Sequence, residues 1–170
     1  MNWLAATRAV AHATVAAVIT FSQVHNGELG LRTLILFGVL YLAASLGTHL
    51  LDNRNKVMSL RLALPTIAPV ITAIVAIVAV FTNLPALATF RWLVVALTLS
   101  FALIEFALYR KFGKKSSDGL DALIAGVASI AMFGIAAGIN TGEVPLIGFF
   151  GAFNVILAVH LGIVATTPKK

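Results

Sequence analysis

The sequence contains no cysteine, and only 11% of its residues are charged. The absence of cysteine excludes disulfides, thiolate catalysis, iron–sulfur clusters and zinc sites with thiolate ligands. A soluble domain carries about a quarter charged residues, so this chain has too little polar surface to face water on all sides. No hydrophilic stretch is long enough to form a second, soluble domain. Residues 1–170 are therefore predicted to form a single transmembrane domain.

Hydrophobic residues make up 60% of the chain and are grouped into six runs. Each run is close to the roughly 20 residues that a helix needs to cross the hydrocarbon core of a bilayer. The sequence therefore predicts an all-α integral membrane protein with six transmembrane helices. The predicted spans are 5–23, 31–51, 61–82, 88–109, 119–139 and 145–166.

The distribution of lysine and arginine predicts the orientation of these spans. With the N-terminus in the cytoplasm, only Arg32 and Arg91 lie outside, and the other ten of the twelve basic residues lie inside. Cytoplasmic loops carry an excess of lysine and arginine, so both termini are predicted to be cytoplasmic in a multi-pass protein of the cell membrane. Nucleic acid is not expected as a partner, because the basic residues lie in short loops. The ten basic residues predicted to lie on the cytoplasmic side are Arg8, Arg54, Lys56, Arg61, Arg110, Lys111, Lys114, Lys115, Lys169 and Lys170.

An internal repeat is indicated by the ends of the spans. The first and third predicted spans end in Phe21-Ser22-Gln23 and Phe81-Thr82-Asn83, 60 residues apart, and an arginine follows each at the start of the next span. Such self-similarity predicts three helical hairpins with short polar outer turns and basic cytoplasmic linkers. The predicted hairpins cover about 1–56, 57–114 and 115–170.

Small residues spaced four apart predict where the helices pack. Ala9, Ala13 and Ala17 share one face of the first span, and Gly134 and Gly138 share one face of the fifth. Because small side chains let helix backbones approach closely in a membrane, these faces are predicted to form helix contacts.

The three-hairpin organisation resembles the HdeD family of short-repeat bacterial membrane proteins. Besides the two outer turns, two similar segments carry the resemblance, Phe37-Gly38-Val39-Leu40-Tyr41 and Phe150-Gly151-Ala152-Phe153-Asn154. The resemblance implies a non-enzymatic bacterial inner-membrane protein linked to acid or envelope stress. It implies no catalytic residue that could be assigned to a position of this sequence.

Ionisable side chains inside the spans are the candidate functional residues, because each costs several kcal/mol in a membrane unless it is paired. All of the candidates, which are named at the end of this paragraph, lie in the predicted cytoplasmic half of the membrane. Two of them, Arg8 and His12, lie one helical turn apart. One hypothesis is a polar cluster with Glu105 at its centre, which would respond to pH because histidine titrates near neutrality. The alternative is that the same side chains reach the interface or tie helices together. The candidates are Glu105, His12, His49, His160 and Arg8.

The sequence predicts no enzyme, cofactor or metal site, since it lacks a Gly-rich phosphate loop, a nucleophile elbow and paired metal ligands on one helix. Haem held by two of the three membrane histidines is a weaker alternative. The expected partners are the lipid bilayer and either further copies of the chain or a larger membrane complex, in which it would be an accessory subunit. Two other functions stay open: a small oligomeric transporter or channel, and an intramembrane enzyme acting on lipid.

Overall fold

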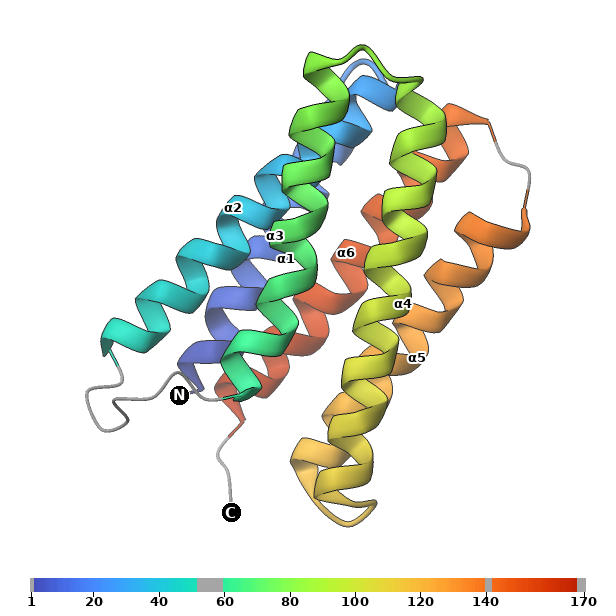
Figure 1. Cartoon of the computed structure of the whole chain (residues 1–170). Coiled ribbons are helices and arrows are strands. Elements are labelled where there is room, and N and C mark those ends of the chain that lie inside the picture. The colour runs from blue at the N-terminus through green and yellow to red at the C-terminus, as the bar shows by residue number, and fades with distance from the viewer. Residues whose placement is uncertain (1, 52–59, 140–141, 168–170) are drawn as a thin grey trace.

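The computed structural model describes residues 2–51, 60–139 and 142–167, with the side chains of 49–51 and 60–64 outside the described part. Within these residues the chain forms six α-helices and no strand. The helices run up and down as an antiparallel bundle (Figure 1). They are α1 (Trp3–Phe21), α2 (Gly27–Leu51), α3 (Leu60–Phe81), α4 (Ala86–Phe112), α5 (Ser117–Gly138) and α6 (Glu143–Thr166).

Five of the six helices, α1, α2, α4, α5 and α6, are long and apolar enough to cross a membrane. This confirms the prediction of an all-α, multi-pass membrane protein. The segment of α3 with described side chains, Pro65–Phe81, is a shorter apolar helix. A sixth crossing, made by α3 as a whole, stays a prediction.

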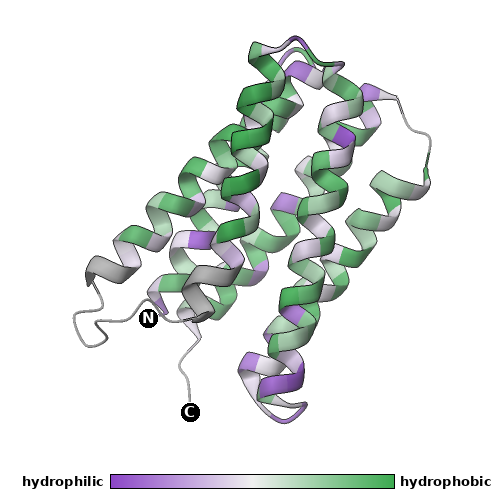
Figure 2. Cartoon of the chain, viewed as in Figure 1, coloured by the Kyte–Doolittle hydropathy of each residue, from purple (hydrophilic) through white to green (hydrophobic). Residues whose placement is uncertain are grey.

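The outer surface of the bundle is apolar. Figure 2 shows hydrophobic residues along the length of the helices and hydrophilic residues mainly at their ends. On α3, the large side chains of Ile67, Ile71, Ile74 and Val78 are each about half exposed. A continuous apolar surface of this kind is unfavourable in water and matches the hydrocarbon interior of a bilayer.

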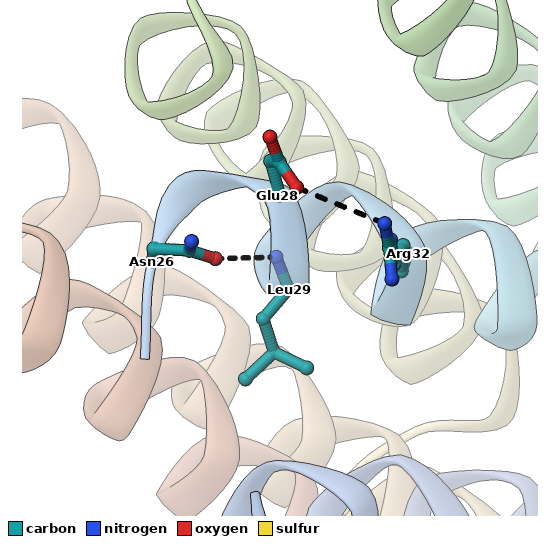
Figure 3. Close-up of polar contacts among 4 residues, drawn as sticks. All are labelled: Asn26, Glu28, Leu29 and Arg32. Carbon is teal, nitrogen blue, oxygen red and sulfur yellow. Dashed lines mark hydrogen bonds and ion pairs between the residues drawn. The ribbon is translucent and has the colours of Figure 1, made fainter. Parts of the chain in front are cut away.

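Three of the described helices, α1, α2 and α5, begin before the predicted apolar run at a polar side chain that caps the first turn. The Ser116 hydroxyl accepts from the Gly119 amide at 2.9 Å, and the Asn26 side chain accepts from the Leu29 amide at 3.0 Å (Figure 3). Such caps satisfy backbone donors that have no partner within the helix.

We call the end of the bundle where α1 begins and α6 ends the proximal end, and the opposite end the distal end. The Asn2 amide donates to the Ala165 carbonyl at 3.0 Å, which joins the start of α1 to the end of α6. The turn between α4 and α5 also lies at the proximal end, where Gly113 adopts a φ of 78°. At the distal end, Asn83 adopts a φ of 53°, which asparagine tolerates better than most residues.

The helices pack as a closed ring, with the most extensive contacts between α4 and α5, α1 and α6, and α2 and α3. Contacts are smaller between α1 and α2, α3 and α4, and α5 and α6. The second helices of the three predicted hairpins, α2, α4 and α6, also contact one another. Each contributes one of the largest fully buried side chains, Phe37, Phe90 and Phe150, and the last two rings meet edge to face with centroids 5.6 Å apart.

The predicted small-residue contacts are wrong within this bundle. Ala13 and Ala17 are exposed, and no atom lies within 4 Å of a Cβ built on Gly134 or Gly138. The buried face of α1 carries Ala5, Ala11, His12, Val15, Ala16 and Ile19. The four-residue spacing correctly places the small residues on one face of the helix. It does not predict whether that face is buried, because the larger side chains on another face of α1 pack into the bundle instead.

Candidate functional site

His12 is the most enclosed ionisable residue that the structure describes, with 1% of its surface exposed. It lies on the buried face of α1, and both of its ring nitrogens are hydrogen-bonded to other helices. Nδ1 lies 2.8 Å from Oδ1 of Asn154 on α6, and Nε2 lies 2.8 Å from the hydroxyl of Tyr41 on α2. One side chain therefore ties three helices together.

The bonding of Asn154 assigns the protons in this network. Its amide nitrogen donates to the Phe150 carbonyl at 2.8 Å, which leaves Oδ1 as the atom facing His12. Oδ1 can only accept, so Nδ1 of His12 carries the proton. Nε2 of the neutral imidazole is then an acceptor, and the Tyr41 hydroxyl donates to it. Every polar atom in the network has a partner, as buried polar groups require.

Aromatic rings enclose His12 on the sides that the hydrogen bonds leave open. Its centroid lies 4.9 Å from that of Phe37, 5.5 Å from Tyr41, 6.3 Å from Phe153 and 6.5 Å from Phe101. These rings come from α2, α4 and α6. In such apolar surroundings of low dielectric, the few hydrogen bonds of a polar group are strengthened, and losing one is costly.

Tyr41 and Asn154 were missed as site residues, although a signal for both is present in the sequence. They occupy the same position in the two similar segments, four residues after Phe37 and Phe150. The glycine of each segment lies against another helix. A Cβ on Gly38 would lie 2.6 Å from the Pro69 carbonyl oxygen of α3, and one on Gly151 would lie 2.9 Å from Cγ2 of Ile19 of α1. Each of the two similar segments thus contains a buried phenylalanine, a glycine packed closely against another helix and a hydrogen-bond partner of His12.

Glu105 and Arg8 line two adjoining cavities on the proximal side of His12. The first, which we call the chamber, measures about 30 Å³ and is also lined by His12, Tyr41, Phe101 and Ser129. The second, which we call the vestibule, measures about 130 Å³ and extends to Asn2 and Asp118 at the starts of α1 and α5. The Arg8 guanidinium carbon also lies 6.0 Å from the centroid of the Tyr41 ring, within range of a cation–π interaction.

The predicted cluster is therefore divided between these two cavities. Arg8, His12 and Glu105 line the chamber, whereas Arg8, Glu105 and His160 line the vestibule. Nε2 of His160 donates to the Asp121 carbonyl of α5 at 3.2 Å. The side chain of His49 lies outside the described residues.

A haem or metal role for His12 does not match its bonding, since both ring nitrogens are occupied by Asn154 and Tyr41. Within the described residues, no group of three or more His, Cys, Asp or Glu side chains is arranged to hold a metal ion. Comparison of the chain with protein-family models, with curated proteins and with solved structures gives no match. The function of the site is therefore inferred from its own geometry.

Proposed function

We propose that this chain is a non-enzymatic protein of the bacterial inner membrane that acts in acid or envelope stress or as an accessory subunit of a membrane complex. The observation that carries this proposal is the hydrogen bonding of both ring nitrogens of His12. A catalytic or ligand-binding histidine keeps one ring nitrogen for the substrate or ligand, whereas both nitrogens of His12 bond to neighbouring helices. That arrangement supports a role in holding and orienting the bundle.

The size of the cavities beside Glu105 supports the same proposal. Pockets for small-molecule ligands commonly measure about 300–1,000 Å³. The chamber and the vestibule, at about 30 and 130 Å³, are smaller and suit water. A groove of about 320 Å³ adjoins the vestibule at Asp121, His160 and Val164, but Glu105 does not line it. An intramembrane enzyme acting on lipid would need a larger opening at this carboxylate.

The proposed orientation has the proximal end in the cytoplasm and six crossings, including α3. Basic residues favour it, because Arg110 and Lys111 lie in the last turn of α4 at the proximal end. Of the two basic residues at the distal end, Arg91 donates to the Ile139 carbonyl at 2.9 Å and Arg32 lies 3.7 Å from Glu28. Each distal arginine thus has a polar partner at its own end of the bundle.

The three-hairpin repeat, the feature behind the resemblance to the HdeD family, is supported by two regularities. Extensive and smaller helix contacts alternate around the ring, as three copies of one hairpin would produce. His12, Thr72 and Ser129 are buried polar residues at the same distance from the last residues of α1, α3 and α5. Thr72 and Ser129 bond to carbonyls of their own helices, so only the first copy extends its polar group to other helices.

A small transporter is the second candidate, and the vestibule is the observation that favours it. Reconstitution into liposomes separates the two functions. The proposal predicts that purified protein in liposomes carrying an internal pH-sensitive dye passes protons no faster than empty liposomes, while a strain lacking the protein survives acid or envelope stress less well. Proton or solute flux that depends on Glu105 would instead establish transport.

A further inference from the structure

We propose that the proximal end of the bundle contains a one-sided path through which water and protons reach His12. The path runs from the vestibule into the chamber. The two cavities adjoin along the side chains of Arg8, Glu105, Ala125 and Leu161, which line both of them. The inference rests on the proposed orientation only for the identity of the compartment, which is the cytoplasm.

The volumes and linings of the cavities match water. A buried water needs about 10–15 Å³ of such space and two to four polar partners. The chamber, at about 30 Å³, has room for one or two molecules, with the polar atoms of Arg8, Tyr41 and Glu105 as partners. The vestibule, at about 130 Å³, holds several and is lined by Asp118, Asp121 and His160.

Glu105 is the carboxylate through which a proton would pass between the cavities. The charged or titratable groups facing His12 across the chamber are Arg8 from α1, Tyr41 from α2 and Glu105 from α4. The groups that α3, α5 and α6 contribute to the chamber do not titrate, and among them are Pro65, Ser129 and Leu157. The other ring nitrogen of His12 meets the neutral amide of Asn154. A proton that Glu105 takes up from the vestibule passes through a chamber water to the Tyr41 hydroxyl, since both residues line the chamber. The Tyr41 hydroxyl in turn gives its own proton to Nε2 of His12.

The path ends at His12 because the distal side of this residue is closed by packed apolar side chains. Val15 and Ile19 lie one and two turns further along α1, and Leu34, Phe90 and Phe150 pack from α2, α4 and α6. None of these five side chains is more than 2% exposed. Protonation of Nε2 turns it from an acceptor into a donor, so the Tyr41 hydroxyl must then donate elsewhere, and the bond between α1 and α2 changes with proximal pH.

The absence of cysteine from the chain allows a direct test by single-cysteine accessibility. Ala125→Cys introduces a thiol at the shared wall of the two cavities, and Ala136→Cys introduces one further along the same helix, where the alanine is also buried but lines neither cavity. Oriented proteoliposomes are exposed to Ag⁺ on one side, and thiols left unreacted are then counted with a maleimide after denaturation. Leu161→Cys, also at the shared wall, carries the test if Ala125→Cys does not fold.

We expect Ag⁺ to react with Ala125→Cys about tenfold faster than with Ala136→Cys, and only from the proximal face, since thiol reactivity follows water access. Equal rates for the two variants, or reaction from the distal face, would overturn the path. A tag at the C-terminus reports which compartment the proximal face occupies. Reaction from the tagged face with the tag outside the cell would overturn the proposed orientation and leave the path intact.

A second measurement tests the proton step. The chain has two tyrosines, so Tyr109→Phe leaves Tyr41 as the single reporter for isotope-edited infrared spectroscopy. We expect the Tyr41 band to shift on acidification, and the shift to be lost when His12→Gln is added. A band that does not respond to pH, or that responds equally without the histidine, overturns the proton step.

Discussion

Asn154 and His12 are separated by 142 residues in the sequence, yet Oδ1 of one lies 2.8 Å from Nδ1 of the other. This bond joins the last helix to the first and closes the ring of six. The Asn2 amide makes a second link between the same two helices at the proximal end, where it donates to Ala165. The bundle is thus closed by one of its most extensive helix interfaces, with these two polar contacts added to it.

Removing one partner of His12 is expected to destabilise the protein. Tyr41→Phe leaves Nε2 without its donor, at a cost of about 0.6 kcal/mol on average and at most about 1.7 kcal/mol for hydrogen bonds between membrane helices. Asn154→Leu leaves a buried N–H unpaired, which costs about 1–3 kcal/mol. Equilibrium unfolding in mixed detergent micelles measures both changes. The control is Ser100→Ala, which removes an exposed hydroxyl bonded within its own helix; an equal loss there would argue against the network.

Gly38 is expected to tolerate no side chain. A Cβ at this position would overlap Cβ of Ala73 and lie 2.6 Å from the Pro69 carbonyl oxygen, and the backbone oxygen cannot move away cheaply. Gly38→Ala should therefore cost about 1–3 kcal/mol through separation of α2 and α3. Gly134→Ala, at an open position, should be neutral or slightly stabilising. Thermal unfolding of the two variants side by side decides the point, and similar melting temperatures would contradict it.

Glu105 and Arg8 are expected to be coupled because they line the same two cavities. Arg8→Met and Glu105→Gln should each destabilise the protein, and the double variant should lose less than the two single losses added together. Glu105→Gln should also alter the pH dependence of stability. Glu143→Gln, in the first turn of α6 at the distal end, is the matched control and should change neither quantity. Additive losses, or equal effects of the two glutamate variants, would exclude the coupling.

The exposed pair of Glu28 and Arg32 is expected to contribute little. Figure 3 shows the pair within one helix. The Arg32 nitrogen and the Glu28 oxygen lie 3.7 Å apart, and about 70% of each side chain is exposed. Arg32→Gln should change the free energy of unfolding by less than about 0.5 kcal/mol, since exposed pairs one turn apart on a helix are weak. Denaturant titration at low and high salt measures this, and a loss above about 1 kcal/mol would point to a further role for Arg32.

The site was only partly predictable because charge is visible in a sequence and the direction of a side chain is not. Ionisable residues in apolar runs identified His12, Glu105, Arg8 and His160, and the structure arranges all four around the two cavities. The direct partners of His12, Asn154 and Tyr41, are neutral, so charge does not distinguish them in the sequence. A polar amide in the middle of α6 is the signal that identifies Asn154 in retrospect.

The sequence by itself determined that the chain is helical and built for a membrane, because the length and apolarity of each run are local properties that require backbone hydrogen bonds within the run. Only the tertiary structure decided which face of each helix is buried. In a bundle surrounded by hydrocarbon, inner and outer faces are both apolar, so hydrophobic periodicity does not distinguish them. Shape and a few polar contacts make that choice, and here they turn His12 inward and the alanines at 13 and 17 outward.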